Sequence, residues 1–270
     1  MKTVGLVLGF GHMGRLHAKR FSARGVQTVC VDGRDACEKA LRDSEISDVD
    51  FVLVATPASS HFAYVRRALE LGKDVFVEKP LATTSADVNA LISLSEKSGK
   101  ILYAGHSERF NPSFLRFREK FLESVRRGAL KKMCFVRHNK GSDRGRDVSA
   151  ALDIGVHDFE LFYELKTAAP NVLWETVDVR FDFSRDALRT MRRIGAVFED
   201  ENGKTWEVSE NLDGNLFEEA DPIGLEQSEF LEMRTLPKER SAKKMRKLLD
   251  GALFAVRVAE RYSTSPNNAK

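Results

Sequence analysis

The first hundred residues alternate short apolar runs with helical patterns, and this alternation constrains the fold more than any other feature. The apolar runs occupy residues 5–9, 27–31, 51–55, 75–77 and 101–104. The helical segments between them are residues 15–24, 34–43, 61–71 and 85–98. This alternation predicts βαβ units that form a parallel sheet. Right-handed crossovers would then bring the carboxyl ends of all strands, at Gly9, Asp32, Thr56, Glu78 and Gly105, to one ligand-binding edge.

A glycine motif joins the first predicted strand to the first predicted helix. It reads Gly9-x-Gly11-x-x-Gly14. In a Rossmann fold the first glycine makes the tight turn, the second lets pyrophosphate approach the backbone, and the third lets helix and strand pack. The helix N-terminus adds N–H donors and a partial positive charge. The context predicts a dinucleotide site, with a glycine turn kept only for packing as the alternative.

Asp32 lies at the end of the second predicted strand, near the spacing at which an acid binds the adenosine ribose. Its carboxylate would accept hydrogen bonds from the ribose hydroxyls and repel a 2′-phosphate, which favours NAD over NADP. Arg34, two residues later, is able to hold that phosphate, or is a solvated cation at a helix start. We expect NAD, with NADP as the alternative.

Overall charge and composition exclude several classes of protein. Lys and Arg number 43 against 40 Asp and Glu, a net charge of +3 that argues against bulk nucleic-acid binding. No apolar run approaches the ~20 residues of a membrane span, and no cleavage site follows the short N-terminal run. Three cysteines, Cys30, Cys37 and Cys134, show no metal-ligand spacing. We therefore expect a cytoplasmic protein with no disulfide, no metal site and no membrane partner.

The pattern changes after about residue 108. Helical patterns at residues 112–127, 150–165, 222–234 and 242–262 surround predicted strands at 132–138, 172–183, 194–198 and 204–208, with a frayed tail from 263. The order predicts an α+β domain with an open, mostly antiparallel or mixed sheet. We expect a dinucleotide-binding domain over residues 1–108 and a substrate and oligomerisation domain over residues 109–270.

Two further motifs carry chemistry. Lys79, in Glu78-Lys79-Pro80, follows the fourth strand, where its ammonium would stabilise an alkoxide at the nicotinamide end of a bound dinucleotide. Asp153 and His157 are four residues apart on a predicted helix, so the carboxylate could orient or polarise the imidazole. Histidine can accept an alcohol proton as hydride leaves. The alternative is a hydrogen-bonded, buried histidine.

At this point the sequence resembles the Gfo/Idh/MocA family of nicotinamide-dependent oxidoreductases. The matching segments are GFGHMGRLHA at 9–18, VLVATPASSHFAYVRRALELGKDVFVEKPLATT at 52–84, GHSERFNP at 105–112 and DIGVHD at 153–158. The resemblance implies a Rossmann domain before an open-sheet domain, with Lys79, Asp153 and His157 catalytic. It further implies a cis Lys79-Pro80 bond and a nicotinamide pocket lined by Glu78 and Pro80. The expected cofactor-binding residues are Gly9, Phe10, Gly11, His12, Met13, Gly14, Asp32, Arg34, Ala55, Thr56, Pro57, His61, Glu78, Lys79 and Pro80.

Residues 105–112 are similar to the segment of UDP-N-acetylglucosamine 3-dehydrogenases and related nucleotide-sugar members. The resemblance implies substrate-binding roles for His106, Glu108, Arg109, Phe110, Asn111 and His157. A basic stretch between Arg126 and Arg146 could hold a diphosphate, or is a solvated face. We expect hydride transfer between NAD and a sugar ring hydroxyl, in a nucleotide sugar such as UDP-N-acetylglucosamine at its 3-position. An inositol or free-sugar dehydrogenase and a non-catalytic dinucleotide- or sugar-binding sensor are the alternatives.

The chain is short beside such relatives. Only 18 residues separate Asp32 from Phe51, where members of the family insert a further helix and strand, so we expect the Rossmann sheet to lack one strand. The charged segment 184–193 stands where the second sheet would continue through more strands. In the family that sheet makes the oligomer face, and we expect any homo-oligomer of this chain to form through it.

Overall fold

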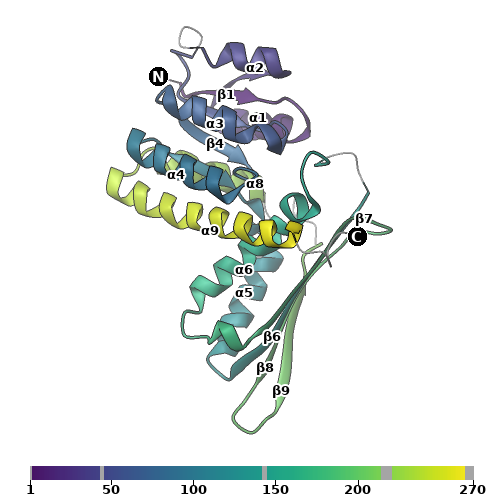
Figure 1. Cartoon of the computed structure of the whole chain (residues 1–270). Helices are drawn as coiled ribbons and strands as arrows, with labels where there is room; N and C mark the ends of the chain where they lie inside the picture. Colours follow the sequence, from purple (N-terminus) through teal and green to yellow (C-terminus); the bar gives the residue numbers. More distant parts are fainter. Residues whose placement is uncertain (1, 43–45, 142–144, 214–220, 265–270) are drawn as a thin grey trace.

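The computed structural model describes residues 2–42, 46–141, 145–213 and 221–264. It contains two sheets with helices packed on them (Figure 1). The first sheet consists of β1 (Val4–Leu8), β2 (Gln27–Val31), β3 (Phe51–Val54), β4 (Asp74–Glu78) and β5 (Leu102–Gly105). Its order is β2-β1-β3-β4-β5, and every pair is parallel, as predicted. Within the described chain β2 is an edge strand, so the expected loss of one strand is confirmed.

The helices of this half lie between consecutive strands. They are α1 (His12–Ala23), α2 (Arg34–Ala40), α3 (His61–Glu70) and α4 (Ser85–Ser98). Both ends of helix α4 are set by local signals in the sequence. Thr84 caps its start by accepting a hydrogen bond from Asp87 N at 3.1 Å, and Gly99 ends it at φ 64°. Strand β3 is fully buried along its length, as expected for a covered parallel sheet.

The second sheet is mixed. Its strands are β6 (Ala129–Lys140), β7 (Asp178–Ala187), β8 (Met191–Glu199) and β9 (Thr205–Asn211), in the order β7-β6-β8-β9. Strand β7 runs parallel to β6, and the other two pairs are antiparallel. The buried side chains of this sheet pack with those of α5 (Pro112–Val125) and α6 (Val156–Ala168) in a second core. The α+β domain with a mixed sheet is therefore confirmed.

Three local features of this half differ in detail from the sequence predictions. The strand predicted from Val172 begins only at Asp178, because Trp174 folds back to donate to Ala169 O at 3.1 Å and a 3₁₀ turn, η4, spans Trp174–Thr176. The charged segment 184–193 is mostly strand, since β7 and β8 both extend into it. The helix predicted over residues 150–165 opens as a π-helical turn, η3, over Ala151–Gly155.

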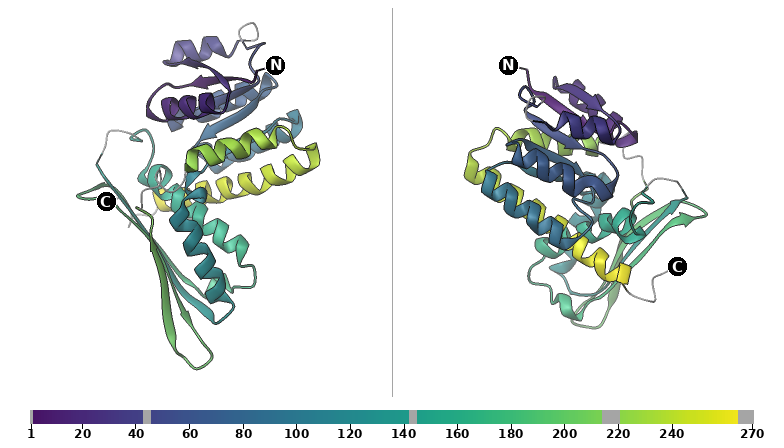
Figure 2. Two further views of the ribbon diagram at one scale, coloured as in Figure 1. Left: turned by 180° about the vertical axis from the view of Figure 1, so that it is seen from behind. Right: turned by 45° about the horizontal axis from the view of Figure 1, so that its top comes forward.

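The C-terminal helices α8 (Pro222–Met233) and α9 (Lys238–Thr264) join the first core. On α8, the Phe230 ring meets the rings of Phe51, Phe76 and Tyr103 with centroids 5.2–5.8 Å apart. Helix α9 contacts both α4 and α6, so it links the two halves of the molecule (Figure 2). It extends through Ser263 and Thr264, where a frayed tail was expected; residues 265–270 lie outside the described part. The domain division at residue 108 stays a prediction.

Two expectations from the sequence concern the cysteines and membrane-spanning helices. All three cysteines, Cys30, Cys37 and Cys134, are free. Among the described residues, no helix combines the length and the apolar composition needed to cross a bilayer.

Candidate active site

The glycine turn between β1 and α1 has the form that a dinucleotide requires. Gly9 has φ +86°, and a Cβ there would lie 2.6 Å from Ala55 O. A Cβ on Gly14 would collide with the carbonyl of Gly9. A Cβ on Gly11, in contrast, would meet nothing within 4 Å. Gly9 and Gly14 are therefore needed for packing, whereas Gly11 leaves open space beside the N-terminus of α1, which fits a pyrophosphate.

The adenosine side of this turn is formed by β2 and the start of α2. Asp32 Oδ1 accepts a hydrogen bond from Phe10 N at 3.1 Å, so its carboxylate lies beside the glycine turn. Arg34 is exposed at the first position of α2. The structure thus brings both residues to the edge where an adenosine ribose would bind. The other expected cofactor residues on this edge, at the end of β1, the start of α1 and the end of β3, are Phe10, His12, Met13, Ala55, Thr56 and Pro57.

His61 lies behind the edge rather than on it. The ring is buried, with Nδ1 2.7 Å from Pro80 O and Nε2 2.9 Å from Thr56 O. Burial lowers its pKa against the opposing effect of the two carbonyl groups. His61 therefore ties the segment after β3 to the Lys79-Pro80 bond, which is cis.

Lys79 reaches across to the second half of the chain. Its Nζ donates to Asp153 O at 2.5 Å and to Asp153 Oδ1 at 3.0 Å. Both side chains keep about a fifth of their surface exposed, at 21% and 20%. Asp153 lies in the π-helical turn η3, a departure from regular helix that is frequent at functional sites. The structure thus brings together two residues that are 74 positions apart in the sequence.

His157 begins the regular part of the same helical segment, in the first turn of α6. Burial, together with the charges of Lys79 and Arg137, lowers its pKa well below the ordinary value, so the imidazole is neutral. Its Nδ1 is buried without a hydrogen-bond partner among the described residues. The role expected for Asp153, to orient or polarise the imidazole, stays a prediction. Its carboxylate accepts from Lys79, and no described contact joins it to the imidazole.

His106, at the end of β5, is a second neutral imidazole. The residue is 3% exposed, and neither ring nitrogen has a hydrogen-bond partner among the described side chains and backbone. Burial and the charge of Arg109 lower its pKa to about 3. Because buried polar groups are normally hydrogen-bonded, an imidazole with two unsatisfied nitrogens indicates a ligand-binding position. Together with the open space at Gly11, it fits a bound dinucleotide and its substrate.

Two other expected substrate residues, Glu108 and Asn111, are occupied within the fold. Glu108 Oε1 accepts from Arg137 at 2.9 Å and from Arg192 at 3.3 Å, and its Oε2 accepts from Asn111 at 3.0 Å. Asn111 also caps α5 by accepting from Ser113 N at 2.9 Å. Sequence reasoning missed Arg137, which is 1% exposed and donates to Asp158 Oδ1 at 2.9 Å. A lone arginine among the inward-facing residues of β6 was the available signal.

Arg109 and Phe110 also lie inside the fold. The Arg109 guanidinium lies over the Phe110 ring, 5.0 Å from its centroid, and donates to Glu229 Oε2 on α8 at 3.1 Å. Arg109 Nε lies 3.6 Å from Glu160 Oε1 on α6. Burial outweighs the attraction of Arg109 and raises the pKa of Glu160 to about 8. The segment 107–111 thus connects α5, α6 and α8. Among the described expected substrate residues from 106 to 111, unsatisfied buried polar atoms are found on both ring nitrogens of His106 and on Arg109 Nε.

The raised pKa of Glu160 gives a prediction for stability. Between the ordinary carboxyl pKa and about 8, the folded chain holds a proton that the unfolded chain has released, so Glu160 makes stability fall as pH rises through this window. We expect Glu160→Gln to become more stable relative to the parent as pH rises from about 5 to about 8. Urea unfolding at both pH values measures this.

The matched control is Glu229→Gln, because Glu229 also faces Arg109 but its pKa is lowered by Arg109 and Tyr103 despite burial. Its stabilising effect is present above the ordinary carboxyl pKa and is lost at acid pH. Glu229→Gln should therefore lose stability near neutral pH. An equal response of both variants would contradict these charge states.

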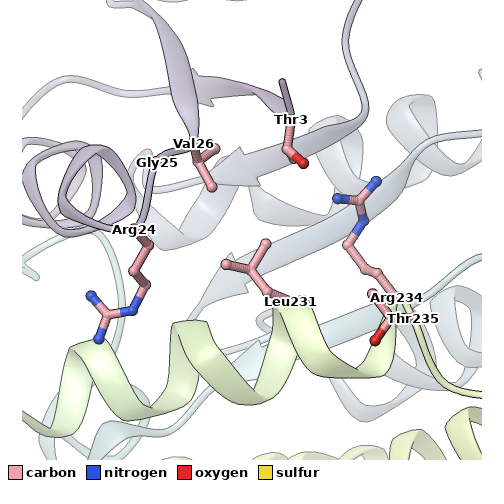
Figure 3. Close-up of a pocket in the computed structure, with 7 residues that line it drawn as sticks. All are labelled: Thr3, Arg24, Gly25, Val26, Leu231, Arg234 and Thr235. Carbon is pink, nitrogen blue, oxygen red and sulfur yellow. The ribbon is translucent and has the colours of Figure 1, made fainter. Parts of the chain in front are cut away.

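A surface pocket lies away from these residues (Figure 3). Its volume is about 330 Å³, and it lies between the amino ends of β1 and β2 and the end of α8. Its lining residues are Thr3, Arg24, Gly25, Val26, Leu231, Arg234 and Thr235. Because ligands of open α/β sheets bind at the carboxyl edge, this pocket is at the wrong end of the sheet for the dinucleotide.

The basic stretch does not form one phosphate-binding face. Arg137 is buried between two carboxylates, Lys131 pairs with Glu199 at 3.0 Å, and Arg146 pairs with Asp186 through Nη1 at 3.1 Å. These cations are already neutralised by neighbours within the second domain. Lys131 and Arg146 thus fit the alternative of a solvated face, whereas Arg137 is buried, and Arg144 lies outside the described residues.

The chain was compared with known proteins. A family model described as the oxidoreductase family with an NAD-binding Rossmann fold, Gfo/Idh/MocA, matches residues 4–106. UDP-N-acetylglucosamine 3-dehydrogenase of Acidithiobacillus ferrooxidans is 29% identical over 185 residues, which cover 64% of this chain and 56% of that protein. Inositol 2-dehydrogenase of Acidothermus cellulolyticus is 35% identical over 130 residues, which cover 42% and 38%. The matched stretches thus span about half or less of these relatives.

Solved structures show the same fold over nearly the whole chain. UDP-N-acetylglucosamine 3-dehydrogenase from Acidithiobacillus ferrooxidans superposes with a TM-score of 0.72 at 21% identity, covering 97% of this chain and 96% of that one. GenD2 from gentamicin A biosynthesis, solved with NAD, gives 0.75 at 19% identity and covers 99% and 94%. Residues 4–106 of the chain are thus similar to the Gfo/Idh/MocA family of oxidoreductases, and nearly the whole chain shares the fold of these solved structures.

Proposed function

We propose that this protein is an NAD-dependent oxidoreductase that oxidises a ring hydroxyl of a nucleotide sugar, with UDP-N-acetylglucosamine and its 3-hydroxyl as the leading candidate. One observation carries the proposal: Lys79 forms a hydrogen-bonded ion pair with Asp153 across the two halves of the chain, next to the neutral His157. This arrangement provides a cation, a carboxylate and a proton acceptor at the carboxyl edge of the sheet. Bound NAD would supply the hydride acceptor there.

The chain's own residues would act as follows. His157, kept neutral, accepts the hydroxyl proton as the C–H bond breaks. The Lys79 ammonium stabilises the developing alkoxide, and Asp153 holds the ammonium in place. His106 offers a hydrogen-bonding group to the bound sugar or nicotinamide. Gly9, Gly11, Gly14 and Asp32 bind the dinucleotide on the other side, and Arg34 is the residue through which NADP could compete.

The second candidate is a dehydrogenase of inositol or of free sugars. The pairing of Arg137, Lys131 and Arg146 with carboxylates favours it, because it leaves those three cations unavailable to a diphosphate. Inositol dehydrogenases also appear among the relatives. A non-catalytic sensor is the third candidate, and the complete set of Lys79, Asp153 and His157 argues against it.

Incubation with NAD and a panel of sugars tests the proposal. The panel contains UDP-linked sugars, the corresponding free sugars and inositols, with NADP in parallel, and the absorbance of reduced nicotinamide is the readout. We expect turnover with NAD and UDP-linked sugars. Turnover only with free polyols would favour the second candidate, and NAD binding without any turnover would favour the sensor. Nicotinamide that co-purifies must be measured first, because a tightly held cofactor would be recycled.

We also propose that the protein works in the cytoplasm and forms homo-oligomers through the second sheet. Helices α5 and α6 cover one face of that sheet (Figure 1). The opposite face carries charged side chains that pair with one another, such as His138 with Asp182 and Arg193 with Glu207. Charged, paired side chains suit a polar interface between copies of the chain.

A further inference from the structure

Four polar side chains form a mostly buried group next to Lys79, between α1, β4 and α8. His17 and Gln227 are 0% exposed, Glu226 is 1% exposed and the Glu78 side chain is 13% exposed. His17 Nε2 lies 2.6 Å from Glu78 Oε1, and Glu78 Oε2 accepts a hydrogen bond from Lys79 N at 3.2 Å. The group thus extends from the core to the residue next to the proposed catalytic lysine.

The hydrogen bonds of Gln227 fix the tautomer of His17. The Gln227 amide nitrogen donates to His17 O at 3.1 Å and lies 2.9 Å from His17 Nδ1. A flipped amide would place its oxygen against the His17 carbonyl oxygen, which has no proton to donate, so the nitrogen must face His17. His17 Nδ1 therefore accepts, and its Nε2 carries the proton that it donates to Glu78. The imidazole is neutral, and Glu78 is a hydrogen-bonded carboxylate.

The geometry differs from that of a metal site. Donor atoms of His17, Glu78 and Glu226 lie within 4.8 Å of one another. Two ligands of one tetrahedral zinc ion, each about 2.0–2.1 Å from the metal, would lie about 3.3 Å apart. His17 Nε2 and Glu78 Oε1 are 2.6 Å apart, which is a hydrogen-bond distance.

The charges around Glu78 leave it with an uncompensated negative charge. Lys79 and Asp153 neutralise each other as an ion pair. Burial and the charge of Glu78 raise the pKa of Glu226 well above its ordinary value, so Glu226 stays protonated. The hydrogen bond from His17 and the charge of Lys79 oppose burial and lower the pKa of Glu78. His106 is neutral, because burial lowers its pKa to about 3, and burial also lowers the pKa of His61.

This carboxylate lies on the side of the sheet where the nicotinamide would bind. With pyrophosphate at the β1–α1 turn and the adenosine ribose at Asp32, directly after β2, the other half of the dinucleotide must extend over β3 and β4. Glu78 is the last residue of β4. The oxidised nicotinamide ring carries a positive charge and the reduced ring carries none.

We propose that Glu78, held as a carboxylate by His17 and Gln227, makes the site bind the oxidised cofactor in preference to the reduced one. Gln227 is then a positioning residue that acts through His17. This inference rests on the proposed dinucleotide binding, but not on the identity of the sugar. It assigns a function to three residues, His17, Gln227 and Glu78, as one unit.

The proposed preference is tested by the ratio of the dissociation constants for NADH and NAD⁺. This ratio is measured by titration of the purified chain without substrate. Glu78→Gln keeps the shape and removes the charge. The Glu78 carboxylate would lie roughly one to two strand spacings from the nicotinamide ring. At an effective dielectric constant of about 20, loss of a unit charge at this distance should shift the ratio at least about tenfold toward NADH. Glu226→Gln is the matched control, because Glu226 is already neutral, and its ratio should stay at the parental value.

An unchanged ratio in Glu78→Gln, or equal shifts in both variants, would overturn the inference. Absence of any NAD binding by the parental chain would instead overturn the proposed function, so the two failures are distinguishable. Nitrogen-15 NMR of the imidazoles provides a second readout. In the parental chain we expect His17 to carry its proton on Nε2 alone, and in Gln227→Leu we expect this single tautomer to be lost. A parental proton on Nδ1 would contradict the assignment.

Discussion

Lys79→Met should lower the rate of hydride transfer by about 10²–10⁴-fold while leaving NAD affinity within a few-fold of the parental value. The methionine keeps the packing of the lysine stem but removes the ammonium that donates to Asp153 O and Oδ1 at 2.5 and 3.0 Å. Without it, no described cation stands beside Asp153 to stabilise an alkoxide. Single-turnover formation of reduced nicotinamide measures the effect, with titration of NAD as the second measurement.

His157→Ala should lose a similar factor, because it removes the proton acceptor while leaving the glycine turn and Asp32 in place. Lys120→Met is the control, since Lys120 forms an exposed ion pair with Glu210 at 2.7 Å, remote from the carboxyl edge, and should keep full activity. Equal collapse of cofactor affinity in Lys79→Met and His157→Ala would argue against catalytic roles and for structural ones.

Arg137→Met should destabilise the fold by about 3–5 kcal/mol, because it removes the buried cation that pairs with Asp158 and leaves Glu108 with Arg192 alone. Arg137 donates to Glu108 Oε1 and Asp158 Oδ1, both at 2.9 Å, and only 1% of the residue is exposed. Urea unfolding at neutral pH measures the loss of free energy. The expected loss is a large fraction of the stability of an ordinary domain.

Two further variants separate charge from packing. Adding Glu108→Gln and Asp158→Asn to Arg137→Met removes the uncompensated charges, so the triple variant should recover part of the loss. Arg180→Met breaks the exposed Arg180–Asp178 pair and should leave the free energy of unfolding close to the parental value, because solvent screens this pair. A triple variant no more stable than Arg137→Met would show that packing of the arginine stem, rather than charge, carries the effect.

The N-terminal half was predictable because each of its signals is local. Strands buried on both faces are continuous apolar runs, and the glycine motif, the Thr84 cap and the Gly99 terminator each act within a few residues. The second half was harder to predict. Strand β7 starts six residues later than predicted because Trp174 docks against Phe121 and Phe162, a contact between distant segments.

The candidate site was predictable where chemistry follows from position at a strand end. Lys79, Asp153 and His157 were expected to be catalytic, and the structure brings Lys79 and Asp153 into contact. Glu108 and Asn111 were expected at the substrate, but they bond Arg137 and cap α5. His17 was missed because it occupies a buried position on α1 that the helical period assigns to an apolar side chain.

The sequence by itself determined the parallel sheet, the dinucleotide turn and the identity of the candidate catalytic residues, because these depend on short-range pattern and on the single edge where parallel strands end. Only the tertiary structure decided which charges are available to act. Burial and pairing across segments more than twenty residues apart neutralise Arg137 and leave Glu78 charged. The free energies of ionising and pairing these buried groups depend on solvent exclusion and on distances between segments, which no local pattern in the chain encodes.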